Sequence, residues 1–223
     1  MSLTSIKSRA EGVKYESENF ENLDLRSMKA FGSVWKDCVF EKCKFDLADL
    51  RTSKFTDCLF RHCSLRLVNF SLGIFENTKF VNCDLEQSSF SGGQFNNGLF
   101  NECRMAYAEE LFSNVTLKGK VAFYSCNFHG SNLCYREASL GTVSYTDCNF
   151  WGARLALGCA FWNAKFDERF IKQIVGLIGR ASGDDFLRDY AGDQYGVVAR
   201  AMDGRKESGE DTIPVHLLKK VVV

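Results

Sequence analysis

Bulky apolar residues recur at every fifth position through the first half of the chain. Eleven of the twelve phenylalanines before residue 106 stand at multiples of five, and only Phe31 is off this register. Other multiples of five mostly carry a further bulky apolar residue, such as Tyr15, Leu25 or Trp35. Random placement would put about two or three of the twelve there, so the five-residue period is a structural signal.

A second series, of small side chains, precedes the first by two positions. Its members include Cys38, Cys43, Ala48, Ser53, Cys58, Cys63, Gly73, Thr78 and Cys83. A period of five fits neither the 3.6-residue period of a helix nor the two-residue period of a flat strand. Two of every five residues therefore face inward on a chain that keeps turning. This predicts a wound solenoid, with large and small side chains alternating in a narrow interior.

Short motifs within this pattern carry a family resemblance. Ala48-Asp49-Leu50, Cys83-Asp84-Leu85 and Ser131-Asn132-Leu133 follow the form A-[DN]-L-x-x, with Cys or Ser in place of Ala in two of them. Residues 15–166 thus resemble the pentapeptide repeat proteins. The resemblance implies an all-β solenoid, a right-handed quadrilateral β-helix in which four pentapeptides make one coil.

Residues twenty apart should then stack on successive coils at the β-sheet spacing of about 4.8 Å. Residues at this spacing do carry the same kind of side chain, which supports the four-sided coil. One predicted inner ladder is aromatic and another is made of thiols: Phe40, Phe60, Phe80 and Phe100, and Cys43, Cys63, Cys83 and Cys103.

The pattern divides the chain into a lead-in at 1–14 and a β-helix at 15–166. The register breaks at 106–122, which is either a protruding loop or two more pentapeptides centred on Phe112 and Leu117. A helical spacing of apolar residues then predicts a C-terminal α-helical cap over 167–202, because an open solenoid end must be covered. The apolar face of the cap holds Phe170, Ile174, Leu177 and Ile178.

Residues 203–223 are expected to form a polar linker and an apolar tail.

Lysine plus arginine and aspartate plus glutamate each total 28, so the formal net charge is +0. This balance gives no bulk electrostatic reason for binding nucleic acid or an anionic membrane. No apolar run reaches 18 residues and the N-terminus lacks a signal-like apolar segment, so we expect a cytoplasmic protein without a membrane contact.

Ten cysteines and three histidines raise the question of metal or redox chemistry. Cys38 and Cys43 have four residues between them, as do Cys58 and Cys63, whereas zinc sites usually use closer pairs on a tight turn. A free cysteine at a small inward position behaves as a small apolar residue. No nucleophile elbow, phosphate loop or dinucleotide motif is present. We therefore expect no cofactor, no metal and no enzyme activity.

Two functions remain open at this stage. The favoured one is a protein-interaction scaffold, in which a rigid rod presents its surface to a protein partner. The resemblance implies the other, because some family members protect DNA gyrase or topoisomerase IV by imitating duplex DNA, giving antibiotic or toxin resistance. Mimicry needs stacked carboxylates, whereas the outward ladders Glu41-Arg61 and Asp46-Arg66-Glu86 mix both signs.

Candidate partner-binding residues follow from the same comparison with the family. Some members carry a projecting loop needed for activity and dimerise through the capped end, which here implies a homodimer through 167–202. The matching candidates in the irregular segment are Tyr107, Glu109, Glu110, Lys118 and Lys120. Outward apolar residues also form two stripes that are typical of partner surfaces, Leu47 with Leu67, and Val39 with Leu59 and Leu99.

Overall fold

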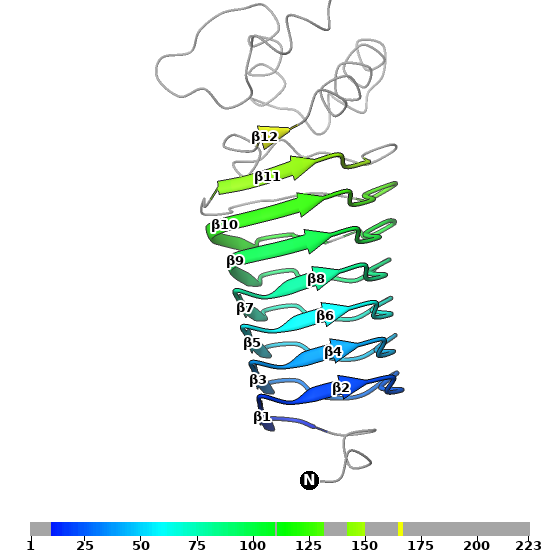
Figure 1. Ribbon diagram of the computed structural model, residues 1–223, viewed down its shortest axis with the longest axis vertical. Coiled ribbons are helices and arrows are strands. Elements are labelled where there is room, and N and C mark those ends of the chain that lie inside the picture. Colours follow the sequence, from blue (N-terminus) through cyan, green and yellow to red (C-terminus); the bar gives the residue numbers. More distant parts are fainter. Residues whose placement is uncertain (1–9, 110, 132–141, 150–164, 167–223) are drawn as a thin grey trace, which may run out of the picture.

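The computed structural model describes residues 10–109, 111–131, 142–149 and 165–166. In this part the chain winds into a rod of stacked coils, with short strands directly above one another (Figure 1). Every strand pair is parallel, and most pairs join residues twenty apart, such as Phe40 with Phe60. The expected quadrilateral β-helix is confirmed.

Two of the four sides carry the strands. Face 1 consists of β1 (Lys14–Glu16), β3 (Val34–Lys36), β5 (Lys54–Thr56), β7 (Ile74–Glu76) and the first parts of β9 (Gln94–Asn101) and β10 (Thr116–Tyr124). Face 2 consists of β2 (Asn19–Glu21), β4 (Val39–Glu41), β6 (Leu59–Arg61), β8 (Lys79–Val81), the second parts of β9 and β10, β11 (Thr142–Thr146) and β12 (Lys165–Phe166). Because β9 and β10 turn the corner between the two faces, all twelve strands form one sheet.

The other two sides are held by single bridges between coils. Face 3 is the ladder Asp24, Lys44, Ser64, Asp84, Arg104, Asn127 and Asn149, and face 4 is the ladder Lys29, Asp49, Asn69 and Ser89. Backbone hydrogen bonds still connect the coils on these sides; the Asn69 amide, for example, donates to the Ala48 carbonyl at 3.0 Å. The coil therefore has four sides, of which two are flat enough to form strands.

Stacked aromatic rings fill the interior. The longest ladder runs behind face 2 through Phe20, Phe40, Phe60, Phe80, Phe100, Phe123 and Tyr145, with centroids 4.5 to 5.1 Å apart. A second ladder behind face 1 contains Tyr15, Trp35, Phe55, Phe75 and Phe95. Rings of the two ladders meet edge to face, as Phe55 and Phe60 do at 5.5 Å. These contacts give a closely packed core with specific aromatic geometry.

Every corner of the coil requires the left-handed backbone region. The second residue after each inward centre has a φ between 49° and 67°, as at Asp57 and Asn77. L-residues adopt this region at a cost, and Gly, Asn and Asp adopt it most readily. The corners are therefore the positions where side-chain identity is most constrained by the backbone alone.

Apart from residue 110, which lies outside the described residues, the segment 106–122 forms a further coil of the rod. Phe112 and Leu117 are buried, Phe112 stacks on Phe90, and Leu117 pairs with Phe95. Two extra residues precede Phe112, so its step from Phe90 is 22, and a β-bulge between Lys118 and Val121 adds one more. Of the two alternatives left open by the sequence, the structure shows the bulged pentapeptides.

The expected cap over 167–202 and the tail over 203–223 lie outside the described residues, as does most of the lead-in. The described part of the chain contains no helix with the length and apolarity of a membrane span.

Candidate partner-binding surface

Charged side chains on faces 1, 2 and 3 pair with opposite charges one coil away. On face 1 the Lys36 ammonium donates to Glu16 at 2.5 Å, and Lys54 lies 3.0 Å from the Glu76 carboxylate. On face 2 Arg61 lies 3.6 Å from Glu41. The hydrogen bond from Lys36 lowers the pKa of Glu16, so this pair stays ionised at neutral pH. Alternating signs along a ladder cancel the field of each face.

Face 3 carries the most connected charge network. The Glu86 carboxylate is almost fully buried between Arg66, at 3.6 Å, and Arg104, at 2.8 Å. Arg104 also approaches Asp84 at 4.0 Å. At the N-terminal end of the same face, hydrogen bonds from Arg26 lower the pKa of Asp24 to about 2. Face 3 is thus an internally compensated surface, and its carboxylates do not form a continuous acidic strip.

The cysteines of the described coils occupy the small inward positions. Eight are free and buried in the described coils: Cys38, Cys43, Cys58, Cys63, Cys83, Cys103, Cys126 and Cys148. The Cys63 thiol donates to the carbonyls of Phe40 and Arg61, both at 3.4 Å, and its neighbours on other coils repeat this pattern. Among the described residues, His, Cys, Asp and Glu form no group of three or more able to hold a metal ion. The thiols therefore serve as interior packing and as donors to the backbone.

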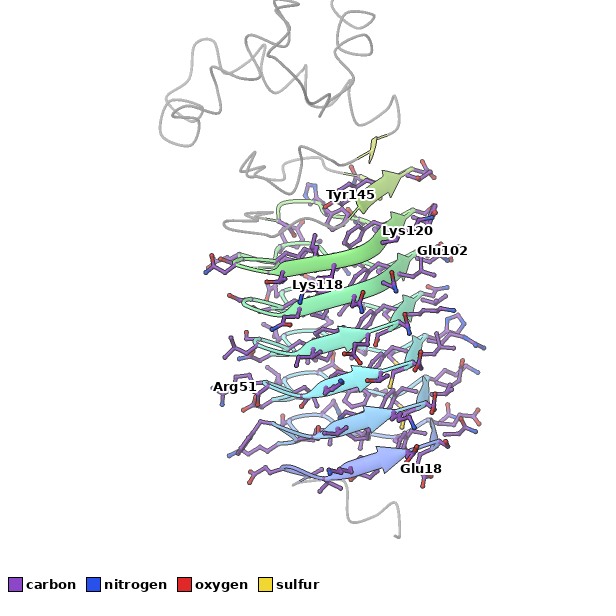
Figure 2. All side chains as sticks on the ribbon, turned by 90° about the vertical axis from the view of Figure 1, so that its left-hand side faces the viewer. Glu18, Arg51, Glu102, Lys118, Lys120 and Tyr145 are labelled. Carbon is purple, nitrogen blue, oxygen red and sulfur yellow. The ribbon has the colours of Figure 1, made fainter. Side chains whose placement is uncertain are left out.

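The structure separates the candidate residues taken from the family comparison. Tyr107 stands at the corner between faces 3 and 4, where its ring meets His129 edge to face at 5.2 Å. Lys118 projects from the face 1 part of β10, whereas Lys120 lies after the β-bulge, where β10 pairs with β11 on face 2 (Figure 2). Glu109 is exposed and Glu110 lies outside the described residues. Tyr107 and the two lysines thus do not share one face.

Exposed apolar side chains gather instead around face 4. Leu47, Leu67 and Tyr107 line its corner with face 3, Leu72 stands at its corner with face 1, and Phe31 projects from its N-terminal end. Their exposed fractions are 60% for Leu47, 46% for Leu67, 46% for Tyr107, 60% for Leu72 and 41% for Phe31. Of the large hydrophobic residues exposed in the described coils, only Tyr124 lies elsewhere, on face 2.

Sequence reasoning found part of this surface. The stripe of Leu47 and Leu67 is present, whereas Leu59 of the other expected stripe is only partly exposed on face 2. Phe31 and Leu72 were missed, although each carried a signal. Phe31 is the one early phenylalanine out of register. Leu72, like Leu47 and Leu67, stands at a corner position, and most corner positions carry Gly or polar residues.

Comparison with known proteins agrees with the repeat. The sequence profile of the pentapeptide repeat region matches residues 33–110, and no curated protein sequence shows significant similarity to the chain. Similar solved structures include QnrB1, a plasmid-mediated fluoroquinolone resistance protein (14% identity, covering 74% of this chain and 98% of that chain, TM-score 0.32). Another is HetL, involved in heterocyst differentiation regulation in Nostoc sp. strain PCC 7120 (12% identity, 72% and 92% coverage, TM-score 0.29).

The profile covers 33–110, and the same inward ladders continue beyond both ends of that range, to Phe20 on one side and to Tyr145 on the other. By its repeat, its four-sided coil and this match, residues 33–110 form a pentapeptide repeat region.

Proposed function

We propose that the chain is a non-enzymatic protein-interaction scaffold, a rigid rod that binds a protein partner through its side. The observation that carries this proposal is the clustering of exposed leucines and aromatic residues along one face. Contiguous exposed apolar patches on soluble proteins commonly mark interaction sites. The stacked interior supports the same role, because aromatic ladders leave the rod little freedom to bend and so hold the surface in a fixed shape.

The buried free thiols favour a reducing compartment, since disulfides form and persist in oxidising ones. The cytoplasm is such a compartment, and we propose that the scaffold acts there.

The alternative, modulation of a type II topoisomerase by DNA mimicry, needs a face that repeats negative charge. The charged ladders alternate instead, as Glu41 with Arg61 and Glu86 between two arginines illustrate. Face 4 beyond Arg51 presents serine and asparagine between its apolar corners. The DNA-binding site of a topoisomerase is built for a ligand that repeats negative charge. Charge complementarity therefore favours another protein surface or a peptide as the partner of this rod.

Site-specific photo-crosslinking tests the scaffold proposal. A photoreactive residue would replace Ser91 on face 4, Asn101 on face 2, Lys36 on face 1 or Lys44 on face 3 in cells that express the chain. We expect a crosslinked adduct with another protein from at least one position. Absence of adducts from all four faces would contradict the scaffold function.

A supercoiling assay with purified DNA gyrase, with and without a quinolone, tests the alternative. We expect no effect of the rod at micromolar concentration. Inhibition or drug protection would replace the scaffold proposal with topoisomerase modulation.

A further inference from the structure

Four corner positions of the coil carry large hydrophobic side chains that the backbone conformation there disfavours. Twenty non-glycine residues have positive φ in the described coils, and most are Asn, Asp, Ser or other polar residues. Four are large and hydrophobic: Leu47, Leu67, Leu72 and Tyr107. A bulky residue in the left-handed region is an outlier, and each of the four is also nearly half exposed or more. Backbone strain and exposed apolar area both act against folding here, so a role outside folding explains these residues best.

The four residues form two rims along face 4. Leu47, Leu67 and Tyr107 make one rim at the corner with face 3, and Leu72 makes the other at the corner with face 1. In Figure 2, face 1 is toward the viewer and Arg51 marks face 4 at the left edge of the rod. Leu72 extends toward the next coil, where Gly92 leaves it space: a Cβ on Gly92 would lie 2.7 Å from Leu72 Cδ2.

Small uncharged polar residues lie between the rims. Asn69, Ser71, Ser89 and Ser91 occupy this strip, and the Ser71 and Ser89 hydroxyl oxygens are 3.3 Å apart. The nearest charges on the same face, Asp49 and Arg51, pair with each other at 2.8 Å. Hydroxyl and amide groups both donate and accept hydrogen bonds, as peptide N–H and C=O groups do. A charged ligand would find no opposite charge on this strip and would lose its hydration.

The size of the strip indicates a peptide, not a second copy of the rod. The rims span four coils, from Leu47 to Tyr107, so the surface between them is about 19 Å long at about 4.8 Å per coil, and three extended residues across it make it about 10 Å wide. A stable interface between two folded proteins usually buries about 800 Å² on each partner, several times the area of this strip. A single extended strand of about six residues has the matching length and width.

We propose that face 4 binds an extended, uncharged peptide segment of a partner protein, lying parallel to the rod axis; this rests on the proposed scaffold function. Successive side chains of an extended strand point to opposite sides. Apolar side chains would alternately contact the Leu47–Leu67–Tyr107 rim and the Leu72 rim. The peptide groups between them would face the hydroxyl and amide groups of Asn69, Ser71 and Ser91.

A selection of phage-displayed random nine-residue peptides on the full chain tests this inference, followed by fluorescence anisotropy with the enriched peptides. The test variant carries Leu67→Asn and Leu72→Asn, which place at two corners the residue that Asn77 and Asn82 already supply at others. Asparagine tolerates positive φ, so this variant should fold and melt at or above the wild-type temperature. The matched control is Tyr124→Asn, an exposed aromatic residue on face 2.

We expect enriched peptides to be uncharged with apolar residues at alternate positions. Their affinity should fall at least tenfold with the double variant and stay unchanged with the control. Failure to enrich such peptides, or equal binding to the double variant, would overturn the inference. So would sedimentation of the wild type as a dimer that the double variant abolishes, because a second copy would then cover face 4. Crosslinks to a partner from faces 1, 2 or 3 only would reject this site and leave the scaffold function standing.

Discussion

At the scale of single residues, the rod depends on flat ring stacking between coils. Phe60 is completely buried and stacks on Phe40 at 4.5 Å and on Phe80 at 4.9 Å. We expect Phe60→Asp to unfold the chain or nearly so. Truncating a buried phenylalanine costs about 3–5 kcal/mol, and an unpaired carboxylate among rings adds to this, against a total stability of about 5–15 kcal/mol. Circular dichroism during heating measures the effect.

Phe60→Leu is the matched control, because it keeps an apolar side chain in the same ladder. It should leave a cooperative transition at a lower temperature. A wild-type melting curve for Phe60→Asp would mean that the inward register described above is wrong.

At the scale of one element, the bulge of β10 depends on Gly119. Its φ is +65°, and an added Cβ would lie 2.3 Å from Asn97 Oδ1. That oxygen accepts a hydrogen bond from the Lys120 amide at 3.0 Å, while the Asn97 amide nitrogen donates to Asn77. Asn97 cannot move aside without breaking these bonds. We expect Gly119→Ala to lower the free energy of unfolding by about 2–3 kcal/mol, combining left-handed strain with lost hydrogen bonds.

Gly32→Ala separates the left-handed strain from the loss of the Asn97 hydrogen bonds. Gly32 has nearly the same φ, +67°, but the nearest atom to its Cβ would be Thr52 Oγ1 at 3.8 Å, an ordinary contact. Urea unfolding should show a loss of about 1 kcal/mol for Gly32→Ala. Equal losses for the two variants would show that the Asn97 contact does not constrain the bulge.

The same element shows where sequence reasoning reaches its limit. The inward positions up to Met105 could be predicted because each coil contains twenty residues. Beyond it, the insertion before Phe112 and the bulge at Gly119 add residues without changing which side chains face inward. A periodicity argument detects the change in phase but cannot tell a projecting loop from a bulged coil. That choice depends on whether Phe112 can stack on Phe90, which is a three-dimensional contact.

At the scale of the whole molecule, the inner surface was predictable and the outer one only in part. Inward positions have one environment, so the repeat alone identifies Phe80 or Cys83 as buried. Outward residues acquire meaning from the face that they share, as Phe31, Leu67 and Leu72 do around face 4. Tyr107 and Lys118 are close in sequence, yet the winding places them on different sides of the rod. Adjacency in sequence was therefore a poor guide to the binding surface.

The buried cysteine thiols make the stability of the whole rod sensitive to alkaline pH. Burial raises the pKa of Cys83, Cys103 and Cys126 above the ordinary thiol value of 9.0. Below that value the thiols are protonated in both the folded and the unfolded chain, and their contribution to stability is fully present. Above it the unfolded chain loses protons that the folded rod retains, so ionisation favours unfolding. We expect the urea midpoint to change little between pH 7 and 8 and to fall steadily above pH 9.

The double variant Cys83→Ala, Cys103→Ala assigns this fall to the thiols. It should be less stable at pH 7, because two buried side chains are shortened, but its midpoint should fall less steeply above pH 9. Other groups that titrate in this range, such as Tyr15, whose pKa burial also raises, are common to both proteins and cancel in the comparison. Parallel curves for the two proteins would show that the buried thiols do not couple folding to pH. A shallower curve for the variant would show that the buried thiols of Cys83 and Cys103 contribute to the alkaline limit of the rod.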